Sequence, residues 1–131
     1  MASTFKSNPA VIFDLFGEPW PDDTTDSTAA WTCWRDGGTC PGVPYQAGGL
    51  QELINVVRAT GATNVLELGG IGYASVFTHL GDNEPTDPGP PGAAATWTSQ
   101  LVADFTITTS GDVPMPPAWT RSSRRSTVRR C

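Results

Sequence analysis

Asn8-Pro-Ala-Val-Ile-Phe-Asp-Leu-Phe-Gly-Glu-Pro19 contains a short apolar run that stops abruptly. Residues 10–16 have the length and composition of a buried strand, and Gly17 and Pro19 end it. Glu18 therefore lies just beyond the carboxyl end of the strand. In α/β barrels the active site is built at this end of the strands, on the loops that follow them. The stretch predicts a strand of an α/β sheet and makes Glu18 a candidate catalytic acid.

A helix and a second strand are predicted next along the chain. Residues 46–60 have the apolar period of an amphipathic helix, and Gly61 follows as its C-terminal cap. The apolar stripe recurs at i, i+3, i+4 and i+7 and consists of Leu50, Leu53, Ile54 and Val57. Residues 64–70 then form a short apolar strand closed by glycines. Strand, helix and strand across this length predict one βαβ unit, in a parallel sheet covered on both faces.

The remaining segments carry weaker signals. Residues 20–45 are rich in Asp, Thr, Gly and Pro and are predicted to form a long loop, although they include several aromatic residues. A short helix is expected at 71–80 and a loop at 82–92. A weak third strand is expected within residues 97–108, with 104–108 as its candidate position, and little order is expected beyond Gly111.

Charge and composition exclude several classes of protein. All 13 acidic residues precede position 121, whereas five of the eight basic residues follow position 120. An acidic body argues against nucleic acid as the main partner, and the arginine-rich end lacks interleaved aromatics, so a solvated, disordered tail is expected there. No run approaches the ~20 apolar residues of a membrane span, and the N-terminus has no signal-peptide pattern. The sequence therefore predicts neither a nucleic-acid nor a membrane partner.

The cysteines indicate a disulfide rather than a metal site. Cys33 and Cys40 lie close together in a Gly/Pro-rich segment, which predicts a local disulfide of the kind that secreted proteins carry. Cys131 remains as an odd thiol at the end of the chain. There is no CxxC motif and His79 is the single histidine, so no metal and no other cofactor is expected.

Several segments resemble glycoside hydrolase family 5, the cellulase-type family, in the family's order and spacing. They are Cys33-Trp-Arg-Asp-Gly-Gly-Thr-Cys-Pro-Gly-Val-Pro-Tyr-Gln46, Gly49-Leu-Gln-Glu-Leu53, Arg58-Ala-Thr-Gly-Ala-Thr-Asn-Val65, Leu68-Gly-Gly70 and Pro85-Thr-Asp-Pro88. The family's fourth barrel strand ends in Asn-Glu-Pro, where this chain has Gly17-Glu18-Pro19. The resemblance implies an α/β fold that is part of a (β/α)8 TIM barrel, with strands four to six and the helices between them.

The same resemblance implies an activity. Family members hydrolyse O-glycosyl bonds in β-linked glucans such as cellulose by a retaining, two-carboxylate mechanism, which needs no cofactor. Glu18 matches the general acid/base of the family. The implied partner is a β-glucan polysaccharide or oligosaccharide, and the implied location is extracellular.

The sequence also departs from the family pattern. The family's nucleophile, a second Glu on the seventh strand, has no counterpart here, and Gly17 lacks the side-chain donor that the family's Asn supplies. A whole barrel needs about 250 residues. We therefore expect a partial catalytic domain over 1–110 and a basic tail over 111–131, and we do not expect this chain to be active on its own. Open sheet edges would favour self-association.

Aromatic side chains near the motif are candidates for stacking on sugar rings. Trp20, Trp34 and Tyr73 are the predicted substrate-binding residues, with Trp20 foremost because it follows the acid closely. Trp34 has an equally good alternative role, which is to pack on the disulfide. Two other functions stay open, namely a non-catalytic carbohydrate-binding remnant that uses these tryptophans and a poorly folded product of a truncated gene.

Two further carboxylates lie in the predicted strands. Asp14 is expected to be a hydrogen-bonded structural residue, because at strand rise it lies about 13 Å from Glu18. Glu67 sits inside the second apolar strand, where burial would raise its pKa. On neighbouring strands, Glu18 and Glu67 are also compatible with the wider carboxylate spacing of an inverting hydrolase, about 6.5–9.5 Å.

Overall fold

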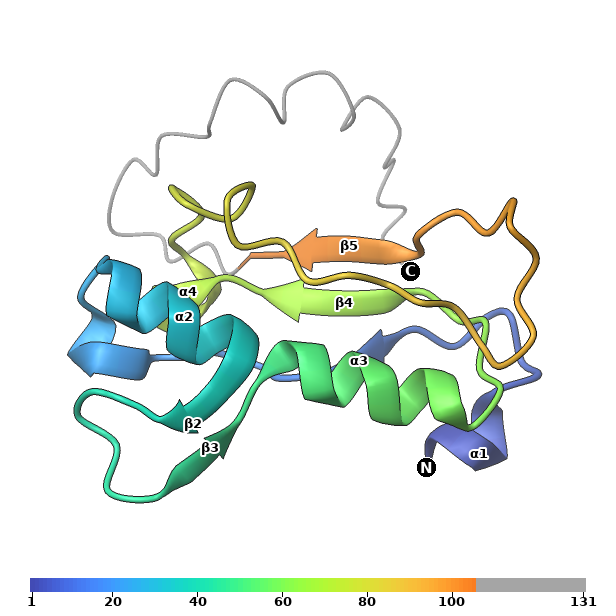
Figure 1. Ribbon diagram of the computed structural model, residues 1–131, viewed down its shortest axis with the longest axis horizontal. Coiled ribbons are helices and arrows are strands. Elements are labelled where there is room, and N and C mark those ends of the chain that lie inside the picture. The colour runs from blue at the N-terminus through green and yellow to red at the C-terminus, as the bar shows by residue number, and fades with distance from the viewer. Residues whose placement is uncertain (106–131) are drawn as a thin grey trace, which may run out of the picture.

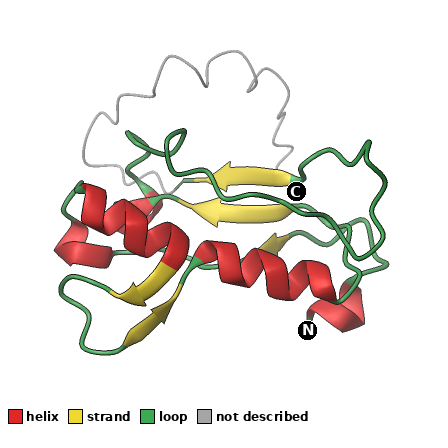
Figure 2. Cartoon of the chain, in the orientation of Figure 1, coloured by secondary structure: helices red, strands yellow, loops and turns green. Residues whose placement is uncertain are grey.

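The computed structural model describes residues 1–105, apart from the side chains of Asp23 and Thr24 (Figures 1 and 2). The elements, in chain order, are α1 (Ala2–Phe5), β1 (Phe13–Asp14), the 3-10 helix η1 (Pro21–Thr24), α2 (Thr28–Asp36), β2 (Gly37–Thr39), β3 (Gln46–Gly48), α3 (Leu50–Ala59), β4 (Leu66–Gly69), α4 (Ile71–Ala74) and β5 (Leu101–Asp104). The predicted disordered tail beyond Gly111 lies outside the described residues.

The main sheet has the strand order β1-β4-β5, and both pairs of strands are parallel. The predicted βαβ unit is therefore confirmed: β1, α3 and β4 follow the predicted order, with α3 alongside the sheet (Figure 1). The third strand predicted within residues 97–108 is confirmed as β5, but it is not at the candidate position 104–108. β5 pairs Leu101–Asp104 with Leu66–Gly69, so the strand lies earlier than 104–108, and positions 106–108 are outside the described residues.

Helices cover one face of this sheet. Leu66 and Leu68 of β4 are buried in a core with residues of α2 and α3, and Phe13 and Leu101 pack against the same core. On the other face, Asp14 of β1 and Val102 of β5 are exposed. The prediction of a sheet covered on both faces is therefore wrong for residues 1–105, since alternate strand positions point away from the helices.

α3 has the predicted apolar stripe but begins later than expected. Leu50 and Ile54 are buried, and Leu53 and Val57 are partly buried against the core. Residues 46–48 form β3 instead, because the hairpin with β2 uses their backbone groups. Gly49 is required between β3 and α3, since a Cβ there would lie 2.3 Å from the carbonyl carbon of Asp36 at the end of α2.

The segment 20–45 was predicted to be a loop, and this prediction was wrong. It contains η1, α2 and β2. The Ser27 hydroxyl accepts a hydrogen bond from the Ala30 amide and caps α2, which is the usual role of serine at a helix start. Trp31 and Trp34 then fill the core and contact each other edge to face, with ring centroids 5.2 Å apart. The aromatic content of the segment reflects a buried helix.

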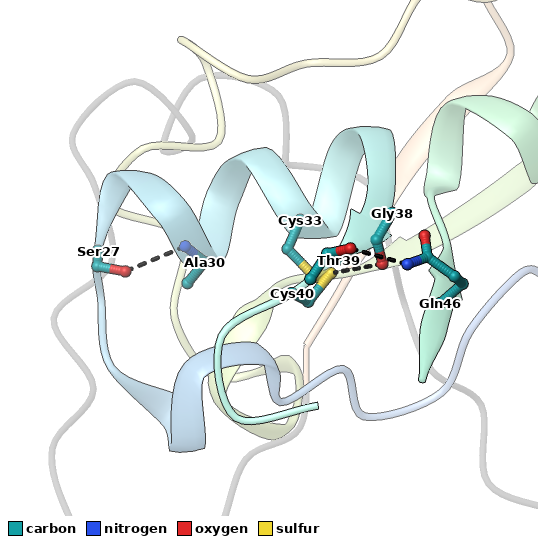
Figure 3. Close-up of a disulfide and its surroundings, with 7 residues drawn as sticks. All are labelled: Ser27, Ala30, Cys33, Gly38, Thr39, Cys40 and Gln46. Atoms are coloured by element: carbon teal, nitrogen blue, oxygen red, sulfur yellow. Dashed lines mark hydrogen bonds between the residues drawn. A yellow bond between two sulfur atoms is a disulfide. The ribbon is translucent and has the colours of Figure 1, made fainter. Parts of the chain in front are cut away.

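The predicted disulfide is confirmed. Cys33 of α2 is bonded to Cys40, which begins the loop between β2 and β3 (Figure 3). The Gln46 side-chain amide donates to the Thr39 hydroxyl across this hairpin at 2.7 Å. A bridge that closes so short a loop stabilises the fold by about 2–3 kcal/mol in the chain-entropy account. The disulfide therefore attaches the hairpin loop to α2.

The predicted helix over 71–80 is shortened to α4. Gly72, Tyr73 and Ala74 all have positive φ, and an isolated bridge between Ile71 and Val76 follows. These left-handed residues turn the chain sharply after β4, because an L-residue helix cannot continue through them. The turn brings Tyr73 back beside the end of β1, where its amide donates to the Pro19 carbonyl at 3.0 Å. Among residues 1–105, no helix is long and apolar enough to cross a membrane.

A buried ion pair joins α3 to the loop that precedes β5. Arg58 donates two hydrogen bonds to Asp87, at 2.8 and 2.9 Å, and the two side chains are 1% and 0% exposed. Arg58 also donates to the carbonyls of Ala62 and Asn64 and lies over the Trp97 ring. This pair links the predicted helix to the predicted loop, a contact that neither local pattern indicates.

Candidate functional site

Glu18 lies exposed after the end of β1, where the sequence predicts a catalytic acid. Its φ of 28° is in the region that non-glycine residues rarely adopt, which costs about 1–3 kcal/mol and is common at functional sites. Gly69 allows the close approach of β1 and β4 here, because a Cβ on it would lie 3.2 Å from the Phe16 carbonyl oxygen. The backbone thus holds Glu18 at the carboxyl edge of the parallel sheet.

Two of the predicted sugar-binding residues lie together beside this turn. Trp20 and Tyr73 stack with ring centroids 6.4 Å apart and an interplanar angle of 13°, and each is 49% exposed. Trp20 comes from the chain after β1, and Tyr73 comes from α4. The pair presents flat, accessible aromatic surface two residues from Glu18, and such surface suits the apolar face of a sugar ring.

Trp34 occupies a different place from this pair. It is 4% exposed, and its indole N–H donates to the Gly69 carbonyl at 2.8 Å. The bond ties α2 to the end of β4, next to the Glu18 turn. Trp34 therefore supports the site from within the core, and its ring also forms part of a cavity wall.

A cavity of about 270 Å³ lies between the end of β1, the hairpin loop and the start of α3. Its lining residues are Phe16, Pro19, Trp20, Pro21, Cys33, Trp34, Gly42, Val43, Pro44, Tyr45, Gln46, Ala47, Gly48, Leu50 and Leu53. Most of these residues are apolar, and two of them flank Glu18 in the sequence. The sequence did not indicate the cavity, because residues 37–45 of the hairpin were predicted to lie in a loop and residues 46–48 in a helix.

Three carboxylates share the uncovered face of the sheet. Asp14 is opposite Glu67 in the register of β1 and β4, and Asp104 lies on β5. Burial raises the pKa of Glu67 above its ordinary value of 4.5, and the negative charges of Asp104 and Asp14 raise it further. The Asp14 carboxylate accepts a hydrogen bond from the Phe16 amide, which confirms the predicted structural role. Among the described residues, no group of His, Cys, Asp or Glu is arranged to hold a metal ion.

The sequence profile of the family described as Cellulase (glycosyl hydrolase family 5) matches residues 1–105. The chain belongs to glycoside hydrolase family 5. Searches of curated proteins and of solved structures found no match to the chain. Membership fixes the class of chemistry as hydrolysis of glycosidic bonds and indicates a glycan as the substrate class.

Family membership gives the arrangement around Glu18 a chemical interpretation. In a family 5 chain, a carboxylate at the carboxyl end of a parallel strand is suited to protonate a glycosidic oxygen. The structure brings Glu18, Trp20 and Tyr73 to one edge of the sheet and places Trp34 behind them. Their roles in catalysis and sugar binding remain predictions.

Replacing Glu67 with glutamine is expected to stabilise the family 5 chain at neutral pH. A raised pKa means that the folded state binds the proton more tightly, so stability falls as the pH rises above about 4.5 and Glu67 ionises. Like charges facing each other across strands cost about 0.2–1 kcal/mol, and the variant should recover that amount at pH 7. Urea unfolding at pH 4 and pH 7 measures the difference. Glu84→Gln, at an exposed loop position, is the control, and an equal gain there would contradict the assignment.

Proposed function

We propose that this family 5 chain acts in the hydrolysis of β-linked glucans such as cellulose, with Glu18 as the general acid/base. One observation carries the proposal: Glu18 is exposed at the carboxyl end of β1, next to the stacked pair Trp20 and Tyr73. An acid at that position can give its proton to the glycosidic oxygen, while the aromatic pair supports a neighbouring sugar ring.

The parallel strands correspond, in this proposal, to the fourth, fifth and sixth strands of the family barrel. β1 carries the acid, β4 follows through α3, and β5 continues the sheet in the same direction. The catalytic part covers 1–110 and the basic tail covers 111–131. An extracellular location agrees with the disulfide between Cys33 and Cys40, since such bonds persist in oxidising compartments. Self-association would proceed through the outer edges of β1 and β5.

Retaining hydrolysis requires a second carboxylate about 5–5.5 Å from the first. In this proposal, Glu18 protonates the leaving oxygen and then activates water, and the second carboxylate attacks the anomeric carbon. The raised pKa of Glu67 favours its neutral form, so Glu67 is less suited to be that nucleophile. Asp14 is held by the Phe16 amide. The proposal therefore gives the role of nucleophile to neither Glu67 nor Asp14.

Removing the Trp20 ring is expected to weaken glucan binding about tenfold. A stacking contact of this kind is worth about 0.5–1.5 kcal/mol beyond the buried area, and about 1.4 kcal/mol corresponds to a factor of ten. Retention of wild type and Trp20→Ala on insoluble cellulose measures the effect. Phe5→Ala removes an exposed aromatic ring from α1 and is the control. Equal retention of all three proteins would contradict a sugar contact at Trp20.

The proposed function is tested by reducing-sugar release from soluble cellulose, with wild type beside Glu18→Gln. Release that depends on Glu18 supports it, and release that is unchanged in the variant overturns it. The Trp20–Tyr73 pair also supports a second candidate, a non-catalytic glucan-binding module. That candidate gains support if neither protein releases sugar while retention depends on Trp20 and not on Glu18.

A further inference from the structure

We propose that the arginine-rich segment 121–130 binds the uncovered face of the β1-β4-β5 sheet and neutralises the three carboxylates on it. These carboxylates belong to Asp14, Glu67 and Asp104. The surface is the face opposite α2 and α3, and its partner is a segment of the same chain. The inference is independent of the proposed function, because it uses neither Glu18 nor a sugar. For residues 121–130 it replaces the expectation of a solvated tail.

The three carboxylates lie close together on this face because of the strand register. Asp14 of β1 is opposite Glu67 of β4, and Glu67 is opposite Val102 of β5. Asp104 follows Val102 by two positions, so its side chain is on the same face of the sheet. Asp14 and Val102 are exposed, and Glu67 and Asp104 are partly buried. A small area of surface therefore holds three acidic side chains.

The three groups are near enough to repel one another. Burial raises the pKa of Glu67, and the negative charges of Asp104 and Asp14 raise it further. A positive group among the carboxylates reduces this repulsion. A guanidinium is well suited to the position, because its fork of N–H donors can bind two carboxylate oxygens at once.

The basic residues in the described part of the chain have other partners. Residues 1–105 include Lys6, Arg35 and Arg58. Lys6 donates to a backbone carbonyl at 2.8 Å, and the two arginines form ion pairs with aspartates elsewhere. The remaining five basic residues are the arginines of segment 121–130. Charge complementarity therefore points to that segment as the partner of the acidic face.

The segment can reach the face from the point where the described chain ends. β5 is an edge strand of the sheet, and Phe105 follows it directly. Sixteen positions separate Phe105 from Arg121, which allows an extended reach of up to about 50 Å. Strands lie about 4.8 Å apart, so three of them are only about 10 Å across. A short tether also keeps the local concentration of the arginines at about the millimolar level, so a weak contact is populated.

A second copy of the chain fits the sheet face less well. Its own sheet presents the same three carboxylates, and two such faces would repel each other. The arginines of a neighbouring molecule could still bind, but they are not held nearby by a tether. Binding within one molecule is therefore favoured, and binding between molecules is an outcome that the experiment must detect.

A nitroxide attached to Cys131 tests the proposal in the full chain. Cys33 and Cys40 are joined to each other, so a thiol reagent has Cys131 as its target. In nuclear magnetic resonance spectra of the labelled protein, the amide signals of Glu67 and Val102 should lose most of their intensity. The signal of Val56, on the exposed side of α3, should keep its intensity. Raising the salt concentration from 0.1 M to 1 M shortens the Debye length from about 10 to 3 Å and should restore the lost signals.

A pair of matched double variants identifies the carboxylates that bind the segment. Asp14→Asn with Asp104→Asn should abolish the loss of signal on the sheet face. Asp82→Asn with Glu84→Gln removes the same charge from exposed loop positions and should leave the loss unchanged. Dichroism shows whether each protein has the wild-type fold, and the salt experiment decides the matter without any variant.

Three results would overturn the proposal. They are an even loss of signal over the whole surface, a loss on the face that persists in 1 M salt, and a loss that persists in the folded Asp14→Asn, Asp104→Asn protein. A mixed sample of nitroxide-labelled protein and unlabelled, nitrogen-15 protein separates the two sources of arginine. Loss of signal on the face of the nitrogen-15 molecules would mean that the segment binds a second copy, against the intramolecular contact proposed here.

Discussion

Replacing Arg58 with methionine is expected to lower the free energy of unfolding by about 3–5 kcal/mol. The side chain is 1% exposed and donates to both oxygens of Asp87. Removing it leaves a carboxylate buried without its counter-charge, which is the costly way to break an ion pair. The loss corresponds to a fall in melting temperature of about 12 °C or more for a domain of this size. Urea unfolding followed by dichroism measures it.

The Asp87 carboxylate shows why the pair has to be intact. Burial alone would raise the pKa of Asp87, but hydrogen bonds from Arg58 and from the amides of Gln100 and Gly89 outweigh it and lower the pKa. A lowered pKa contributes stability above the ordinary value of 3.8, and this stability is lost as the pH falls through the folded-state pKa. Without Arg58, the pKa of Asp87 should be raised instead of lowered. The Arg58→Met variant should then be more stable in acid than at neutral pH, relative to wild type.

Two further variants separate the buried charge from other effects. Arg35→Met removes a surface ion pair in which the side chains of Arg35 and Asp36 are 34% and 48% exposed. This change should lower the free energy of unfolding by less than about 1 kcal/mol. The double variant Arg58→Met with Asp87→Asn removes both charges and keeps an acceptor for the Gln100 amide. Its loss of unfolding free energy should be smaller, by at least about 1.5 kcal/mol, than the losses of the two single variants added together. Additive losses would show that Arg58 acts by packing alone.

Elements with a strong local period could be predicted from the sequence. The stripe of α3 holds the helix against β4, and the alternation of Leu66 and Leu68 sets which face of that strand is buried. Parallel pairing of β1 and β4 followed from the long connection between them, because parallel strands need a crossover, and the predicted helix α3 lies within it. The exact strand ends did not follow, since β1 is limited to Phe13 and Asp14 by its pairing with β4.

The missed helix α2 shows where local signals fail. Its residues include threonine, tryptophan and cysteine, which have modest helix propensity, and glycine- and proline-rich chain follows it. Two signals were nevertheless present, namely Ser27 as a cap and the spacing of Ala30, Trp31 and Trp34 on one side. Tertiary burial of the two indoles outweighs the weak propensity. The ion pair of Arg58 and Asp87 had no local signal, because its partners are 29 positions apart.

The candidate site was predictable in part for the same reason. Glu18 and Trp20 are two positions apart in the sequence, so the end of a strand places both at once. Their meeting with Tyr73 depends on the left-handed turn of α4, which a pattern of apolar residues does not reveal. The burial of Trp34 depends on α2. Long-range packing, rather than local sequence, completes the site.

Replacing Glu18 with glutamine is expected to lower the rate of glucan hydrolysis about 10²–10⁴-fold, the usual contribution of a positioned acid or base. Glutamine has nearly the same shape but cannot give or take the proton. Since Glu18 is exposed and Gly17 and Pro19 set its backbone, the change should leave the fold intact. Reducing-sugar release from soluble cellulose measures the rate, and dichroism confirms the fold.

The chain contains a closely matched control for this variant. Asn83-Glu84-Pro85 repeats the Glu-Pro dipeptide in an exposed loop that follows no strand. Glu84→Gln should therefore keep the wild-type rate. An equal loss in both variants would mean that the effect of Glu18 comes from lost surface charge rather than from proton transfer.

The leaving group distinguishes proton donation from other roles of Glu18. A poor leaving group such as a sugar hydroxyl needs protonation as its bond breaks, whereas a nitrophenolate departs readily without it. The Glu18→Gln variant should therefore lose much more activity on soluble cellulose than on 4-nitrophenyl β-cellobioside, when bond cleavage limits both rates. A substrate-positioning residue would instead lower both rates by the same factor. Equal losses on the two substrates would remove Glu18 from the acid role and leave it as a contact that holds the sugar.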